Sequence, residues 1–213
     1  MATSKIEPAS PRTWLVVAAE ERELEFLFGG EKRERASVAA RFACELGARG
    51  DRWILVANGP GKLAVEALEK RIEVNGIIST GFCGALDPEL RVGDIVEQVA
   101  SIDRVAVTAA EKRALREKTG ARAVDMESAG LERKAAEWGV AFRVIRAISD
   151  TAEEDMPLDF NFYRDGEGRF SRVRIALAAL ARPLRRVPAL LRLDRNTKIA
   201  ARRLGEYFAD CEL

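Results

Sequence analysis

Four short apolar runs, each followed by glycines or an acidic residue, constrain the fold of this chain most strongly. The runs are WLVVAA (residues 14–19), RWILVA (52–57), NGIIST (75–80) and VAFRVIRAI (140–148). Runs of this length that are rich in β-branched residues are typical of strands buried on both faces. Because strands that alternate with helices form a parallel sheet covered on both sides, the sequence predicts an α/β fold with three layers, αβα, and a mixed, mainly parallel central sheet.

The helices between the runs have recognisable ends. Thr108 as N-cap and Gly120 after the last turn predict a helix over residues 108–118. Gly139 is expected to close a second helix over residues 128–138. Weaker patterns predict further helical segments at residues 20–28, 62–70, 170–181 and 189–208, with Pro183 and Pro188 interrupting the last two, and a strand over residues 38–46.

The composition excludes several functional classes. The 213 residues include no histidine and three cysteines without paired spacing, and the net charge is +1. Zinc sites of the usual type and Ser-His or Cys-His nucleophiles are therefore excluded, so no metal is expected, and the balanced charge does not indicate a nucleic-acid partner. Any general acid or base must be Asp, Glu, Lys, Tyr or Cys. Because the chain has neither a signal-peptide core nor an apolar stretch of about 20 residues, we expect a soluble cytoplasmic protein.

One domain behind a short tail explains the chain most economically. Residues 1–13 are expected to be a flexible tail, and residues 14–213 are long enough for a single core. Residues 164–208 form a basic helical segment, in which 12 Lys and Arg stand against three acids between Arg164 and Arg203. We expect this segment to pack on the sheet with a solvated basic face. The alternative is a peripheral contact of that face with an anionic membrane.

Two carboxylates follow predicted strands, at the edge where open α/β sheets bind ligands. Glu127 lies between a short strand and the helix at 128–138, and Asp150 closes the run at 140–148. The glycine-rich turns NGPGK and GFCGAL also follow strands, and such turns expose backbone N–H groups that hold anions. The opposing interpretation is that the glycines serve turn geometry alone, that Asp150 caps a turn and that Glu127 lies on an exposed helix face.

Five motifs in a fixed order carry a resemblance to a known family: VVAAEERELEFL, NGPGK, ISTGFCGALDPELRVGDIV, AVDMESAG and VIRAISD. Over residues 14–150 the chain resembles the purine nucleoside phosphorylase and nucleosidase superfamily, which includes methylthioadenosine/S-adenosylhomocysteine nucleosidases. The resemblance implies the phosphorylase/hydrolase-like fold, a small nucleoside substrate, no cofactor apart from inorganic phosphate as a co-substrate, and a homodimer. The short form and the Asp159-Phe160-Asn161 sequence before a basic tail look most like the hopanoid-associated phosphorylases, which implies the lipid-linked nucleoside adenosylhopane as substrate.

The resemblance also implies roles for individual residues. Asp150, oriented by Ser149, would protonate the departing purine, and a dry site would have to keep its proton near neutral pH. Glu127 would bind the ribose 2′- and 3′-hydroxyls and stabilise an oxocarbenium-like transition state, with Met126 packed on the sugar. The remaining substrate contacts are expected from Thr80, Gly81, Phe82 and Asp103.

The sequence leaves the nucleophile open. Arg22 aligns with the water-activating glutamate of nucleosidases, and an arginine there would grip phosphate together with donors from Thr80, Gly81 and the turn at 59–61. Equally, Glu21 or Glu23 would turn inward as the catalytic base, with Arg22 on the surface. The sequence therefore favours neither hydrolysis nor phosphorolysis over the other.

A shortened segment bears on the substrate. Only 29 residues separate Glu97 from Glu127, where superfamily members carry extra strands and a substrate loop, and the residues around Asp103 resemble a remnant of that loop. The pocket should therefore be more open on the 5′ side of the ribose. We predict cleavage of the N-glycosidic bond of a purine nucleoside, a 5′-substituted adenosine, by water or phosphate. The alternatives are a non-catalytic ligand-binding relative and a peripheral membrane protein.

Overall fold

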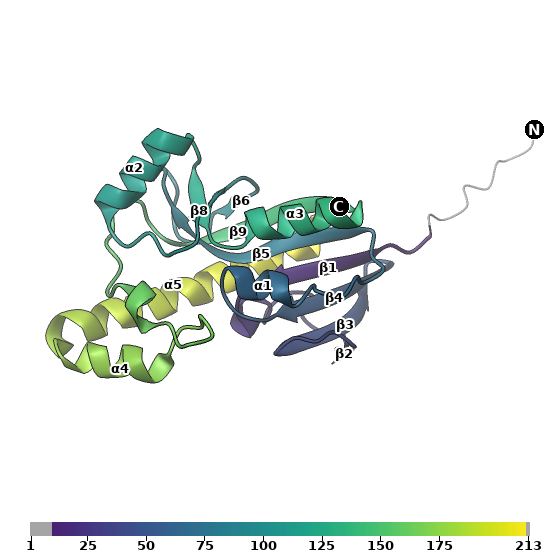
Figure 1. Cartoon of the computed structure of the whole chain (residues 1–213), viewed down its shortest axis with the longest axis horizontal. Helices are drawn as coiled ribbons and strands as arrows, with labels where there is room; N and C mark the ends of the chain where they lie inside the picture. Colours follow the sequence, from purple (N-terminus) through teal and green to yellow (C-terminus); the bar gives the residue numbers. More distant parts are fainter. Residues whose placement is uncertain (1–9, 212–213) are drawn as a thin grey trace, which may run out of the picture.

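The computed structural model describes residues 10–211 and has one mixed sheet at its centre (Figure 1). Four parallel strands form the middle of the sheet in the spatial order β4 (Asp51–Ala57), β1 (Thr13–Ala18), β5 (Gly76–Ala85) and β9 (Ala141–Asp150). They correspond to the four apolar runs of the sequence. The predicted α/β fold with a mixed, mainly parallel central sheet is confirmed.

Short strands extend the sheet around this parallel centre. Near the end of β5, a register shift between Cys83 and Gly84 interrupts its pairing with β9. The last two residues of β5 also pair with β8. The end of β5 is therefore held between two other strand ends. The added strands are β3 (Phe42–Ala48) and β2 (Glu34–Arg35) beyond β4, β8 (Ala123–Asp125) and β7 (Ala100–Ser101) beyond β5, and β6 (Ile95–Val96) against β9.

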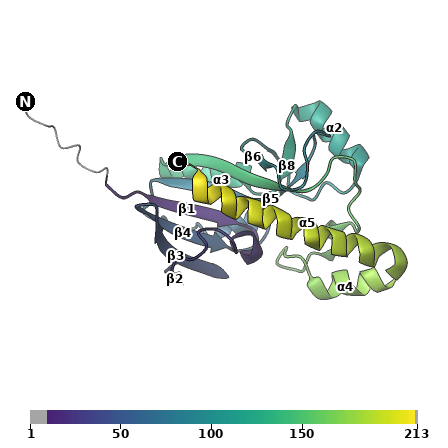
Figure 2. The same cartoon turned by 180° about the vertical axis from the view of Figure 1, so that it is seen from behind.

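Helices cover both faces of the sheet, as the αβα prediction requires. The long helix α5 (Pro183–Asp210) crosses one face and is seen in front in Figure 2. Two helices, α1 (Lys62–Glu66) and α3 (Ser128–Trp138), cover the other face (Figure 1). Two further helices lie beyond the sheet: α2 (Ala109–Thr119) and α4 (Arg172–Leu180), with short 3-10 turns η1 (Glu21–Glu23) and η2 (Phe160–Tyr163).

The core has two parts, one on each face of β1. Val16 packs in a cluster with Leu204 and Phe208 of α5, whereas Leu15 packs in the opposite cluster with Leu131 of α3, and Val17 shares the side of Leu15. Side chains alternate between the faces of a strand. Because each face is covered by helix, both sets must be apolar, and this explains the uninterrupted run WLVVA in the sequence.

The best predicted helices were those with capping residues. Helices α2 and α3 lie close to the predicted ranges, Thr108 Oγ1 accepts a hydrogen bond from the N–H of Glu111, and Gly120 and Gly139 end the two helices with φ of +70° and +67°. Elements without caps deviate more. The helix predicted over 62–70 ends at Glu66, residues 20–28 form only η1 followed by turns, and the strand predicted over 38–46 begins at Phe42.

Two other boundaries are corrected. Thr13 belongs to β1 and the N–H of Arg12 donates to Asp51 Oδ1 at 2.8 Å, so the predicted tail does not extend to residue 13, and residues 1–9 lie outside the described residues. The predicted interruption of the last helix is absent, because α5 starts at Pro183 and continues through Pro188. Proline suits the first helical position, where the N–H has no partner.

None of the described helices is both long and apolar enough to cross a membrane. Helix α4 and the first half of α5 instead form a helical hairpin, residues 172–195, that projects beyond the sheet (Figure 1). Part of this hairpin, including Ile175 and Leu190, lines a cavity at the end of the sheet.

Candidate active site

A cavity of about 680 Å³ lies at the carboxyl ends of β5, β8 and β9. Glu127 and Asp150 both line it and both are buried. The interpretation that Glu127 lies on an exposed helix face is therefore wrong. Of the ten predicted site residues, the cavity is lined by Glu127, Asp150, Met126, Ser149, Phe82 and Arg22, and not by Glu21, Thr80, Gly81 or Asp103.

Glu127 is held by a backbone donor and by a buried arginine. Its Oε1 accepts the N–H of Gly61 at 2.8 Å, and its Oε2 lies 3.0 Å from Nη2 of Arg146. Burial raises the pKa of Glu127 above its ordinary value, although the Arg146 guanidinium opposes this shift. The turn NGPGK was expected to bind an anion, and the anion that its Gly61 binds is this carboxylate.

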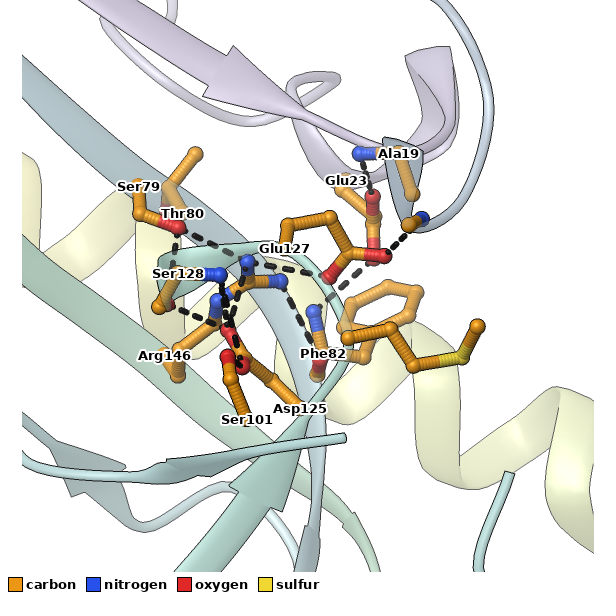
Figure 3. Close-up of polar contacts among 12 residues, drawn as sticks. Ala19, Glu23, Ser79, Thr80, Phe82, Ser101, Asp125, Glu127, Ser128 and Arg146 are labelled. Atoms are coloured by element: carbon orange, nitrogen blue, oxygen red, sulfur yellow. Dashed lines mark hydrogen bonds and ion pairs between the residues drawn. The ribbon is translucent and has the colours of Figure 1, made fainter. Parts of the chain in front are cut away.

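Arg146 is the buried cation that organises this end of the cavity (Figure 3). Its Nη2 also lies 2.9 Å from Asp125 Oδ2 and donates to Ser79 Oγ at 2.8 Å, and Asp125 accepts further hydrogen bonds from the hydroxyls of Ser101 and Ser128. The sequence analysis missed Arg146. The available signal was weak: the run at 140–148 is apolar apart from Arg143 and Arg146, and a buried charge in such a run requires partners.

Glu23 lines the cavity from η1. It is one of the two carboxylates that the sequence allowed as the catalytic base. Its Oε2 accepts the N–H groups of Ala19 and Glu20, both at 2.8 Å, and its Oε1 accepts that of Phe82 at 2.9 Å (Figure 3). Burial raises the pKa of Glu23 from 4.5 to about 7, against the opposing effects of Arg146 and the backbone donors. A carboxylate has about four acceptor sites, so capacity for a further donor remains.

Glu21 and Arg22 are placed differently from Glu23. Glu21 is exposed and outside the cavity, because the turn of η1 directs it to solvent, so the prediction that it joins the site is corrected. Arg22 lines the rim, where its Nε lies 2.6 Å from Glu20 Oε2 and its guanidinium carbon 5.7 Å from the centre of the Phe82 ring. The rim arginine is thus already paired with a carboxylate.

Asp150 has a hydroxyl partner and a cationic partner. Ser149 Oγ donates to its Oδ1 at 2.8 Å, as the predicted orienting role requires, and Lys112 Nζ lies 2.6 Å from its Oδ2. The sequence analysis expected only a dry site here and missed Lys112. The sequence signal for the burial of Lys112 was weak: Lys112 precedes Leu115 by three residues in the helix, so the two side chains lie on the same helix face.

The glycines of the second turn make room for two carboxylates. Gly81 has a φ of +123°, and a Cβ added there would lie 2.7 Å from Glu23 Oε1. A Cβ at Gly84 would lie 2.9 Å from Asp150 Oδ2. Thr80 Oγ1 donates to the carbonyl of Ile145 at 2.9 Å and is fully buried. Thr80 and Gly81 therefore support the site from behind, and the predicted direct contacts with substrate are corrected.

Another part of the cavity wall is apolar. Asp103 is exposed and outside it, although the next residues, 104–106, line the cavity. Apolar side chains come from η2, from the segments on either side of it and from the helical hairpin: Met156, Phe160, Phe170, Ile175, Leu190 and Leu193. In the part of the chain that the structure describes, no group of His, Cys, Asp or Glu is arranged to hold a metal ion.

Residues 98–182 match the family model of the phosphorylase superfamily. A search among curated protein sequences gave no match. The fold is similar to that of futalosine hydrolase of Helicobacter pylori strain 26695, with 14% identity, 92% of this chain and 95% of that chain covered, and a TM-score of 0.68.

Two nucleosidases have a similar fold. The 5′-methylthioadenosine/S-adenosylhomocysteine nucleosidase from Neisseria meningitidis, in complex with methylthio-immucillin-A, is 20% identical, with 93% of this chain and 97% of that chain covered and a TM-score of 0.66. The S-adenosylhomocysteine nucleosidase from Streptococcus pyogenes, in complex with 5-methylthiotubericidin, is 18% identical, with coverage of 97% and 100% and a TM-score of 0.63. At these identities the likeness establishes the fold.

The family match covers the segment that carries most of the polar groups of the cavity. Residues 98–182 include Lys112, Asp125, Glu127, Arg146 and Asp150. The motifs AVDMESAG and VIRAISD, on which the resemblance depended, both lie inside it. The resemblance found in the sequence is confirmed over residues 98–182, which match the phosphorylase superfamily model, and the fold is similar to that of the nucleosidases.

Proposed function

We propose that this protein is an enzyme that hydrolyses the N-glycosidic bond of a purine nucleoside and releases the free base. The observation that carries the proposal is that three buried carboxylates, Glu23, Glu127 and Asp150, line one cavity and are held by different partners. Such a reaction needs a base for water, an anion near the sugar and an acid for the leaving purine. Each carboxylate suits one of these tasks.

Glu127 would bind the ribose. Its two oxygens are fixed by Gly61 and Arg146, so its position does not depend on the substrate. Its remaining acceptor sites would take the 2′- and 3′-hydroxyls. As the bond between C1′ and the purine breaks, positive charge grows on the sugar, and a fixed anion beside it lowers the barrier. Met126, on the adjoining wall, would pack on the sugar.

Glu23 would activate water. A general base is most useful when its pKa lies near the working pH, and burial raises that of Glu23 to about 7. Phosphorolysis would instead need free donors for phosphate. The donors expected for that purpose are otherwise engaged: Gly61 with Glu127, and Thr80 with a backbone carbonyl. Arg22 at the rim is the feature that favours phosphate, and omission of phosphate tests it.

The substrate would be a 5′-substituted adenosine. The apolar wall formed by η2 and the helical hairpin continues the cavity away from the carboxylates, and a cavity of about 680 Å³ has the size of a drug-sized ligand site. An apolar group on the 5′ carbon would remove this surface from water. An apolar substituent of this kind is consistent with a lipid-linked nucleoside such as adenosylhopane.

We also propose that the helical hairpin contacts an anionic membrane surface. Leu184 is 92% exposed, and Leu177, Leu180 and Leu191 are each more than half exposed, which is unusual for leucines on monomers. Exposed Arg182 and Arg185 lie beside Leu184 in the chain. Leucines with arginines suit an interface between lipid tails and anionic head groups.

Vesicle sedimentation tests this contact. Binding to vesicles with anionic lipid and not to zwitterionic ones is expected, with a loss of binding in Leu184→Glu. Retained binding by that variant would argue against the hairpin as the contact. The alternative partner for the exposed leucines is a second copy of the chain, in the expected homodimer. A dimer measured by light scattering that Leu184→Glu dissociates would favour that partner.

A purine-release assay tests the enzymatic proposal. The pure protein is incubated with adenosine, 5′-methylthioadenosine and a 5′-alkyl adenosine, each with and without phosphate, and free adenine is measured. We expect release without phosphate, faster for the 5′-alkyl substrate, and a loss of about 10²-fold or more in Glu23→Gln. Tight nucleoside binding by folded protein without release would favour the non-catalytic ligand-binding relative, and release only with phosphate would favour phosphorolysis.

A further inference from the structure

Lys112 is a buried lysine whose charge is directed at the proposed acid. It is the buried residue of α2, its side chain is 1% exposed, and it also lines the cavity. Its Nζ donates to Asp150 Oδ2 at 2.6 Å, to the carbonyl of Thr151 at 2.7 Å and to that of Glu154 at 3.1 Å. An ammonium has three donors, so all three are used. A buried charge is tolerated when it is satisfied in this way.

The pairing poses a difficulty for Asp150 as a lone acid. In an ion pair with an ammonium, a carboxylate has no proton of its own to give, and Asp150 also accepts the hydroxyl of Ser149. The departing purine nevertheless needs a proton, because otherwise it leaves as an anion. In this arrangement the nearest available proton is on Nζ of Lys112.

We propose that Lys112 supplies the proton that Asp150 hands to the departing purine, so that the Lys112–Asp150 pair is the general acid. This rests on the proposed function. The bond between C1′ and the purine nitrogen breaks, and its electron pair stays with the purine. The carboxylate of Asp150 takes a proton from Nζ and passes one to the purine, which leaves neutral. Water bonds to C1′ and loses a proton to Glu23, and exchange with solvent restores Lys112 and Glu23.

The pair removes a conflict between the acid and the base. Glu23 is ionised, and able to activate water, only above a pH of about 7, because burial raises its pKa to about 7. An aspartic acid without a partner ordinarily ionises near pH 4, whereas an ammonium ordinarily keeps its proton to about pH 10. As a class, ammonium groups therefore match a base that works near pH 7 better than lone carboxylic acids do.

Lys112 is the cation that pairs with Asp150, because the other charged groups nearby have partners of their own. Cys83 on β5 remains a thiol, since burial raises its pKa well above the ordinary value. Asp125 and Glu127 are both paired with Arg146. Apart from Glu23, the other charged groups that line the cavity are paired elsewhere: Arg22 and Arg172 with Glu20, Asp194 with Lys198, and Arg104 with Glu111.

The test compares two substitutions of Lys112 with a matched control, in a purine-release assay from pH 6 to 9. Lys112→Met removes the proton source. Lys112→Arg keeps the charge and the donors, but a guanidinium does not release its proton. The control, Lys134→Met, breaks the pair between Lys134 and Glu137 on the surface of α3. Thermal unfolding and binding of a nucleoside analogue confirm that each variant is folded.

We expect kcat at pH 8 to fall about 10²-fold or more in both Lys112 variants, with KM changed by only a few-fold, and to be unchanged in the control. The ratio of wild-type to Lys112→Met kcat should shrink as the pH is lowered, because protons from solvent then replace the missing donor, while the titration of Glu23 cancels in the ratio. If Lys112 only fixes the loop at 151–154, the kcat ratio should not change with pH and Lys112→Arg should remain active. This result would overturn the proposal.

Two further outcomes are separable from these. If neither variant folds, the wild-type profile decides: turnover sustained to about pH 9 supports the lysine as proton source, and a loss between pH 7 and 8 overturns it. If the folded wild-type protein releases no purine from any of the nucleosides, the proposed function itself fails, and the role of Lys112 fails with it.

Discussion

Replacing Gly81 by alanine should displace the proposed base without changing the base itself. Gly81 has a φ of +123°, and an added Cβ would lie 2.7 Å from Oε1 and 2.8 Å from Cδ of Glu23. Real Cβ atoms do not approach other atoms this closely, so either the strand or the carboxylate must move. A moved carboxylate loses the hydrogen bond that Glu23 accepts from the N–H of Phe82.

The size of the effect follows from these two contributions. Holding an L side chain at this φ costs about 1–3 kcal/mol, and loss of the hydrogen bond to the Glu23 carboxylate costs about 1.5–3 kcal/mol. The free energy of unfolding should thus fall by roughly 2.5–6 kcal/mol, which is roughly 5–25 °C in Tm for a chain of this length. Turnover should fall about 10²-fold or more, as for loss of a general base.

Two other glycines provide matched controls. Gly30 has a φ of +96° with no atom within 4 Å of an added Cβ, so Gly30→Ala reports the backbone cost alone. Gly47 lies in β3, and its added Cβ also has no atom within 4 Å, so Gly47→Ala reports an added methyl alone. Both should keep full turnover, and Gly81→Ala should be less stable than Gly30→Ala.

A double-mutant cycle with Glu23→Gln completes the test. If Gly81→Ala acts by moving Glu23, its effect on turnover should largely vanish in the Glu23→Gln background. Full turnover by Gly81→Ala, or an equal loss in both backgrounds, would refute the reasoning. The Tm comparison with Gly30→Ala remains informative even without a turnover assay.

Two more predictions concern stability. Because the pKa of Glu23 is raised from 4.5 to about 7, its favourable contribution is present below pH 4.5 and is lost as the pH rises through 7; Glu23→Gln should therefore stabilise more at pH 8 than at pH 5, by up to about 3 kcal/mol, and equal Tm differences at the two pH values would contradict this. A Cβ at Gly205 of α5 would lie 2.5 Å from the carbonyl oxygen of Phe26; Gly205→Ala should lower the free energy of unfolding in urea by about 1–3 kcal/mol, and an unchanged midpoint would exclude this close approach.

The parts of the fold that were predictable depend on local rules. Helix α2 begins at a threonine whose hydroxyl caps it and ends at a glycine with positive φ, and both features can be identified from residue types alone. The four central strands were found because a strand covered on both faces must be apolar throughout. Pro188 was misjudged for the opposite reason: a proline near the start of a helix removes only one hydrogen bond, and the length of α5 compensates.

The parts of the site that were missed depend on tertiary contacts. Glu23 and Glu21 are two residues apart in an acidic stretch, and only the turn of η1 decides which one is buried. Lys112 and Arg146 are charged residues whose burial follows from partners far away in sequence: Asp150 for the lysine, Asp125 and Glu127 for the arginine. The motifs carried the resemblance to a family, whereas the pairing of the buried charges could be found only from the fold.

The charge balance of the cavity bears on the choice between water and phosphate. Four buried carboxylates, Glu23, Asp125, Glu127 and Asp150, face two buried cations, Arg146 and Lys112. The buried carboxylates of this cluster therefore outnumber its buried cations by two. Such an excess favours a cation that develops on the sugar, and it opposes the entry of an anionic nucleophile, since like charges repel strongly where water is excluded. This excess therefore favours neutral water over phosphate, so added phosphate should not accelerate purine release, and a phosphate-dependent rate would mean that the exposed Arg22 outweighs the buried carboxylates.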